Sequence, residues 1–77
     1  MDTEDLKEQR KYVERGDLFD RLGKYEDAII AYDNALDIVP DDADVLYDKA
    51  ETLVKLGRVP EATQCFDTAT QMYLGKF

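Results

Sequence analysis

The sequence repeats itself at a period of 34 residues. A shift of that length places Leu22 and Gly23 on Leu56 and Gly57. Small and acidic positions also fall on identical residues: Ala28 on Ala62, Asp33 on Asp67 and Ala35 on Ala69. Self-similarity at a fixed period of this length indicates a repeat protein, in which copies of one unit stack side by side. We therefore predict a single domain over residues 1–77, with one copy at about 9–42 and the other at about 43–76.

Each copy has the pattern of two helices. An apolar stripe at three- and four-residue spacing marks the first helix of the second copy: Leu46, Ala50 and Leu53. Asp41 and Asp42 stand before this helix, where they can cap its free N–H groups, and Pro40 ends the preceding helix. Gly57 suits a left-handed residue after the stripe, and Pro60 fits the first turn of the last helix.

The first copy follows the same plan. We expect its first helix to begin near residue 4 and to end near Leu22, with a turn at Gly23. The second helix then runs from about Tyr25 to Ile38. Because no segment alternates apolar and polar residues like a strand, the predicted fold class is all-α, with two antiparallel helix pairs.

Small residues recur where the two helices of a pair must approach closely. Glycine or alanine occupies these positions in both copies: Gly16, Ala28, Ala35, Ala50, Ala62 and Ala69. Larger side chains then fill the space between the pairs: Tyr12, Phe19, Tyr32, Leu46, Leu53 and Phe66.

Composition excludes several classes of function. The chain has 18 acidic and 10 basic residues, and its net charge of −8 opposes binding to the phosphates of nucleic acids. No apolar run approaches the roughly 20 residues that span a bilayer, so we expect no membrane partner. The single cysteine, Cys65, cannot form an internal disulfide, which favours a reducing compartment such as the cytoplasm.

The sequence also gives no pattern typical of an enzyme, a cofactor or a metal. It contains no histidine, so Cys65 has no partner for a nucleophilic dyad, and there is no glycine-rich phosphate loop. Asp41, Asp42 and Asp44 lack the glycine and the downstream glutamate of a calcium loop. We therefore expect neither catalysis nor a bound cofactor or metal.

The repeated unit resembles the tetratricopeptide repeat. In the first copy the resemblance rests on the stretch Gly23 to Ile29 and continues through Tyr32, Ala35, Leu36 and Pro40. In the second copy it rests on Leu56, Gly57, Arg58, Glu61, Ala62, Phe66 and Ala69. It implies a short right-handed superhelix of two repeats that acts as a non-enzymatic protein-interaction module. The chain departs from the family pattern at Arg15 and Lys49, where a large apolar residue is usual, and at Leu74, which stands where a proline is expected.

The resemblance further implies a concave groove lined by the first helix of each pair. By register the first copy contributes Arg10, Val13, Glu14, Asp17, Asp20 and Arg21, and the second contributes Asp44, Tyr47, Asp48, Glu51, Val54 and Lys55. Chaperone-binding members of the family hold an acidic tail with lysine and asparagine at the positions of Val13, Asp17 and Asp48. The acids here would repel such a tail, so the implied partner is a basic or mixed-charge peptide or helix. The alternative is that these acids only keep the surface soluble.

A second possible function is self-association, as a homodimer or as the edge of a longer solenoid. Two repeats are fewer than the usual three. Apolar residues on the outer face of the first copy, Ile29, Ile30 and Leu36, become Thr63, Gln64 and Thr70 in the second, as a terminal cap requires. Apolar residues nevertheless remain on and after the last helix: Phe66, Met72, Tyr73, Leu74 and Phe77.

Overall fold

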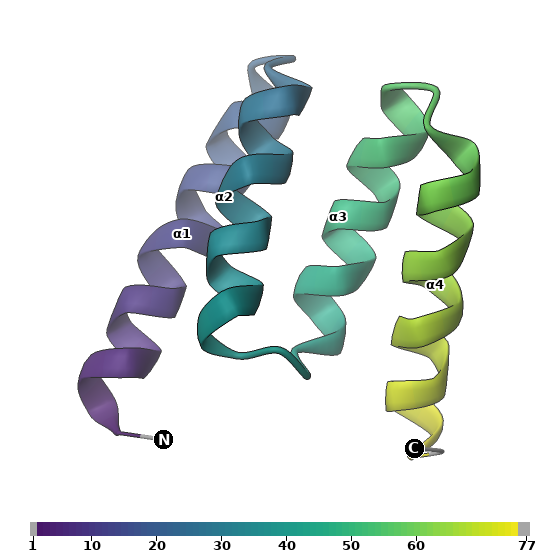
Figure 1. Cartoon of the computed structure of the whole chain (residues 1–77). Helices are drawn as coiled ribbons and strands as arrows, with labels where there is room; N and C mark the ends of the chain where they lie inside the picture. The colour runs from purple at the N-terminus through teal and green to yellow at the C-terminus, as the bar shows by residue number, and fades with distance from the viewer. Residues whose placement is uncertain (1, 76–77) are drawn as a thin grey trace.

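The computed structural model describes residues 2–75 and places them in four helices. These are α1 (Thr3–Arg21), α2 (Tyr25–Ile38), α3 (Ala43–Lys55) and α4 (Val59–Leu74). The described residues contain no strand, so the prediction of an all-α fold is confirmed, as are breaks near Gly23, Pro40 and Gly57. Figure 1 shows the helices running alternately up and down, so that α1 and α3 point the same way.

The helix ends follow from a few local residues. The N–H of Val45 donates to the Asp42 carboxylate (3.2 Å), so Asp42 caps α3 as predicted. Asp2 caps α1 by accepting the N–H of Asp5 at 2.9 Å. Gly23 and Gly57 follow α1 and α3 with φ angles of 76° and 80°, which only glycine adopts readily.

The helices pack in chain order, α1 on α2, α2 on α3 and α3 on α4 (Figure 1). The result is a slab of 36 × 31 × 14 Å. The alanines predicted to permit close approach are all at most 1% exposed: Ala28, Ala35, Ala50, Ala62 and Ala69. The helices approach even more closely at Gly16, because a Cβ atom there would lie 2.6 Å from Cε1 of the Tyr32 ring.

Two apolar clusters form the core. One joins α2 to the start of α3 through Ala28, Tyr32, Ala35 and Val45, and the other joins α2, α3 and α4 through Ile29, Leu53 and Ala62. The expectation for Ile30 is wrong, since 59% of it is exposed, whereas its neighbour Ile29 is 7% exposed. Successive residues point about 100° apart on a helix, so the second repeat covers one isoleucine and leaves the other in solvent.

Candidate functional site

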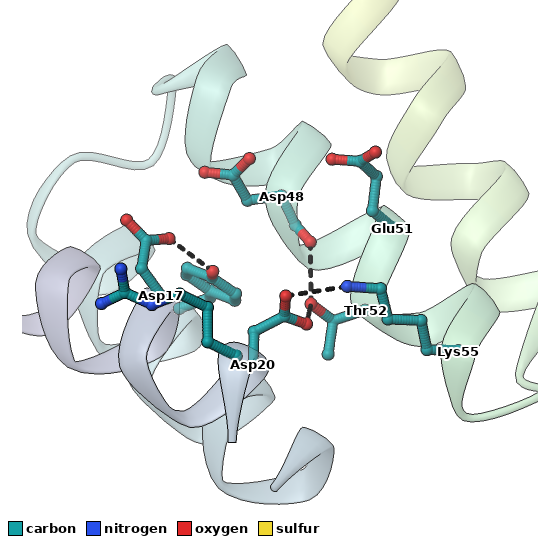
Figure 2. Close-up of a pocket in the computed structure, with 8 residues that line it drawn as sticks. Asp17, Asp20, Asp48, Glu51, Thr52 and Lys55 are labelled. Carbon is teal, nitrogen blue, oxygen red and sulfur yellow. Dashed lines mark hydrogen bonds and ion pairs between the residues drawn. The ribbon is translucent and has the colours of Figure 1, made fainter. Parts of the chain in front are cut away.

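A cleft of about 310 Å³ lies between α1 and α3. Helix α1 contributes Asp17, Asp20 and Arg21, α3 contributes Asp48, Glu51, Thr52 and Lys55, and Tyr32 of α2 completes the lining. Figure 2 shows the side chains of the two helices converging across this space. Four carboxylates therefore face two basic groups in one hollow. The structure brings together six of the residues expected to form the groove: Asp17, Asp20, Arg21, Asp48, Glu51 and Lys55.

Hydrogen bonds fix two of these carboxylates to neighbouring helices. The Tyr32 hydroxyl donates to Oδ1 of Asp17 at 2.6 Å. The carboxylate of Asp20 accepts from the Thr52 hydroxyl at 2.9 Å through Oδ1 and from Nζ of Lys55 at 2.8 Å through Oδ2. Asp17 and Asp20 thus help to hold α1 against α2 and α3, besides facing the cleft (Figure 2).

Sequence reasoning missed Thr52, which is 1% exposed. Comparison of the two copies does contain a signal for it. Thr52 corresponds to Leu18 in the first copy, and its partner Asp20 corresponds to Val54 in the second. Both members of the pair are therefore polar where the two repeats meet, whereas their counterparts Leu18 and Val54 are apolar and exposed.

Asp48 stands apart from the other acids of the cleft. Within residues 2–75, no donor or cation lies at bonding distance from its carboxylate. Burial, together with the negative charges of Asp17, Glu51, Asp44 and Asp20, raises the pKa of Asp48 to about 6. The ionised carboxylate is therefore less stable here than in water, because it has lost solvent and gained like-charged neighbours.

Tyr32 and Lys55 of the cleft have raised pKa values that leave their charge unchanged at neutral pH. Burial and the hydrogen bond to Asp17 raise the pKa of Tyr32, so its hydroxyl stays protonated. The hydrogen bond to Asp20 raises the pKa of Lys55, which stays cationic. The cleft consequently presents an excess of negative charge, centred on Asp48 and the exposed carboxylate of Glu51.

A second hollow of about 140 Å³ continues from Asp48 toward the N-terminal ends of α1 and α3. Gln9, Arg10, Val13, Asp42, Asp44 and Val45 line it together with Asp48. Nε2 of Gln9 donates to Oδ2 of Asp42 at 2.8 Å and closes the end of this hollow. The two hollows share Asp48, so polar and apolar lining residues follow one another along the same pair of helices.

A family model for the tetratricopeptide repeat matches residues 21–73. The chain belongs to the tetratricopeptide repeat family. Comparison with curated proteins and with solved structures gives no significant match. The family is one of protein–protein interaction modules. No helix within residues 2–75 of this tetratricopeptide repeat protein has the length and apolar character to cross a membrane.

Six of the residues expected in the groove do not line the cleft of this tetratricopeptide repeat protein: Arg10, Val13, Glu14, Asp44, Tyr47 and Val54. Val13 lines the smaller hollow and packs against the first core cluster. Tyr47 and Val54 line neither hollow and are 44% and 48% exposed. The Tyr47 ring meets Phe66 of α4 edge-on at 5.2 Å, because it lies on the side of α3 next to α4.

The residues expected to mediate self-association fall into two groups. Phe66 and Met72 are half-buried, and Phe66 packs on the second core cluster. Tyr73 and Leu74 are 56% and 63% exposed. The Tyr73 hydroxyl donates to Asp44 at 2.5 Å, which ties the end of α4 to the start of α3. Phe77 lies outside the described residues.

Proposed function

We propose that the cleft between α1 and α3 binds a basic segment of a partner protein, with a lysine or arginine side chain placed against Asp48 and Glu51. The observation that carries this proposal is the Asp48 carboxylate, which is partly desolvated and has no partner among the described residues. Membership in the tetratricopeptide repeat family supports the general class of function.

Charge explains why the ligand is basic. The repulsion among Asp48, Asp17 and Glu51 is present whenever the chain is folded at neutral pH, and a cation in the cleft replaces it with attraction. An acidic tail would add a further negative charge to a hollow that already has four carboxylates. The same argument makes salt an inhibitor of binding, because exposed charges are screened over about 8 Å at physiological ionic strength.

The apolar side chains nearest Asp48 are not the ones that the register placed in the groove. Tyr47 and Val54 line neither hollow. Val13 and Val45 line the hollow next to Asp48. A ligand with a small apolar side chain a few residues from its lysine fits this order of contacts along α1 and α3.

Titration calorimetry with a matched pair of short peptides tests the proposal. One peptide has a lysine near a valine, and the other has glutamate in place of that lysine. We expect the lysine peptide to bind and the glutamate peptide not to bind. Combining Asp48→Asn with Glu51→Gln should weaken binding roughly tenfold, which corresponds to about 1.4 kcal/mol.

The matched control combines Asp27→Asn with Asp37→Asn, which removes two exposed charges from α2, away from the cleft. It should leave the affinity unchanged within about twofold, the size of a distant charge effect in salt. Equal affinity for both peptides, or a loss of affinity as large with the control as with the cleft variant, would contradict the proposal.

A further inference from the structure

We infer that copies of this chain stack head to tail, with the outer face of α1 in one copy covering the open face of α3 and α4 in the next. The inference does not depend on what the cleft binds. It follows from applying the 34-residue period to the contacts between the two repeats. Those contacts show how one unit covers the next, and the same period locates the surfaces that remain uncovered at either end.

Three polar contacts define how the second repeat sits on the first. Thr52 and Lys55 of α3 contact Asp20 of α1. Lys49 of α3 pairs with Asp33 of α2, with Nζ and Oδ1 2.6 Å apart. Val45 of α3 adds the apolar part by packing into the cluster around Tyr32.

Val13 packs against the same cluster as Val45. Shifting Val13, Asp20, Tyr32 and Asp33 forward by one period gives the trailing face, which consists of Tyr47, Val54, Phe66 and Asp67. Tyr47 and Val54 are 44% and 48% exposed, Asp67 is exposed and Phe66 is half-buried. Figure 1 shows no further helix beside α4, so in a single copy this face meets solvent.

Shifting the α3 members back by one period gives the leading face, which consists of Lys11, Arg15, Leu18 and Arg21 on α1. Their three- and four-residue spacing places them along one side of the helix. Leu18 is 48% exposed, and the three basic residues are exposed as well.

The two faces match at Leu18 and at Arg15, whereas Arg21, the counterpart of Lys55, would meet Val54 in place of the carboxylate of Asp20. Leu18 of one copy would meet Val54 of the next, where Thr52 meets Asp20 inside the chain. Leu18 on the leading face and Val54 on the trailing face are both apolar, although faces adapted to solvent would have polar residues at these positions. Arg15 would meet Asp67 and so reproduce the charges of Lys49 and Asp33.

Lys11 makes the remaining contact of the leading face. It takes the place of Val45, opposite the edge-on rings of Tyr47 and Phe66. A lysine ammonium over an aromatic face is attracted by the ring. The leading face is therefore mostly basic and aliphatic, whereas the trailing face offers aromatic rings, an aliphatic side chain and a carboxylate.

The contact between two copies should be weaker than the contact between the two repeats of one chain. Ile29 and Leu36, which line the internal interface, are replaced by Thr63 and Thr70 on the trailing side. The net charge of −8 also separates the copies. Because the two faces are different surfaces, each added copy leaves one of each kind free, and assembly continues beyond a dimer unless a ring closes.

Sedimentation and light scattering over a range of protein concentrations test this arrangement. For the wild type, we expect the average mass to rise with concentration without stopping at two chains. Leu18→Glu places a charge in the leading face, and Val54→Glu places one in the trailing face. Each variant should raise the dissociation constant between copies roughly tenfold or more, because association would bury the new charge against an apolar residue. Both sites are exposed, so circular dichroism should show unchanged folding.

The decisive sample is an equal mixture of the two variants. Each variant retains the one face that the other lacks, so the mixture should form complexes of two chains and no larger ones. Ile30→Glu is the matched control, because Ile30 is 59% exposed on α2 and belongs to neither face. It should assemble like the wild type.

Three results would overturn the inference. The first is a wild-type chain that stays monomeric at millimolar concentration. The second is a mass that stops at two chains, with only Val54→Glu affecting it, which would indicate pairing of two trailing faces about a two-fold axis. The third is equal weakening by Ile30→Glu, which would indicate a general effect of added negative charge.

Discussion

Asp48→Asn should stabilise the folded chain at neutral pH. In the folded state, the pKa of this carboxyl rises from 3.8 to about 6, chiefly through burial and then through repulsion by Asp17 and Glu51. A shift of about two units corresponds to about 3 kcal/mol, at 1.36 kcal/mol per unit. Because the side chain is only half-buried, solvent screens part of this energy, and we expect a gain of about 1–1.5 kcal/mol in the free energy of unfolding.

The pH dependence gives this prediction its sign. Between pH 3.8 and about 6, the folded chain holds the Asp48 proton more tightly than the unfolded chain does. The contribution of this group to the free energy of unfolding therefore falls as the pH rises through that window. The difference between the asparagine variant and the wild type should be at its full value above pH 6 and should shrink to its acid baseline below pH 4.

Urea unfolding followed by circular dichroism at several pH values measures this difference. Asp37→Asn makes the same change in net charge at an exposed site on α2, so it separates a local effect from general relief of the −8 charge. A gain that is the same at every pH, or equally large for Asp37→Asn, would refute the argument that Asp48 is destabilised by its surroundings in the cleft.

Three further substitutions test the packing. Gly16→Ala should destabilise the chain by about 1–2 kcal/mol in urea unfolding, because the new Cβ would meet the ring of Tyr32, which is 2% exposed; overpacking here exceeds the gain in helix propensity, and an unchanged midpoint would mean that the ring can move. Thr52→Val should cost about 1–3 kcal/mol, since it removes a buried hydroxyl from Asp20, and a neutral result would show that water replaces the hydroxyl. Ala62→Leu should lower the melting temperature through overpacking of about 1–3 kcal/mol between α3 and α4, and no change would place the close contact elsewhere.

The sequence predicts the helices and their turns well because their signals are local. Gly23 and Gly57 mark the two tight turns within the repeats, and the 34-residue period shows that both copies have the same plan. Buried alanines follow from the same periodicity, since a position that is small in both copies is one where two helices approach closely.

The site was less predictable because it depends on the rotation and offset of α3 against α1. Periodicity places Tyr47 and Asp48 side by side on one helix, but it does not show that Asp48 enters the cleft while Tyr47 turns toward Phe66. The bond between Thr52 and Asp20 joins residues 32 apart in sequence, and no local signal indicates it.

The order in which the helices pack also affects how the chain folds and opens. Consecutive helices make most of the contacts, so contacting residues are close in sequence, and chains of this kind fold within microseconds to milliseconds. Helix α2 has neighbours on two sides, whereas α4 packs mainly on α3. Release of α4 is therefore less costly than release of α2 or α3, and it uncovers Leu53, which is otherwise fully buried. A protease acting on the native chain should consequently cut at the turn around Gly57 before it cuts at the turn around Pro40.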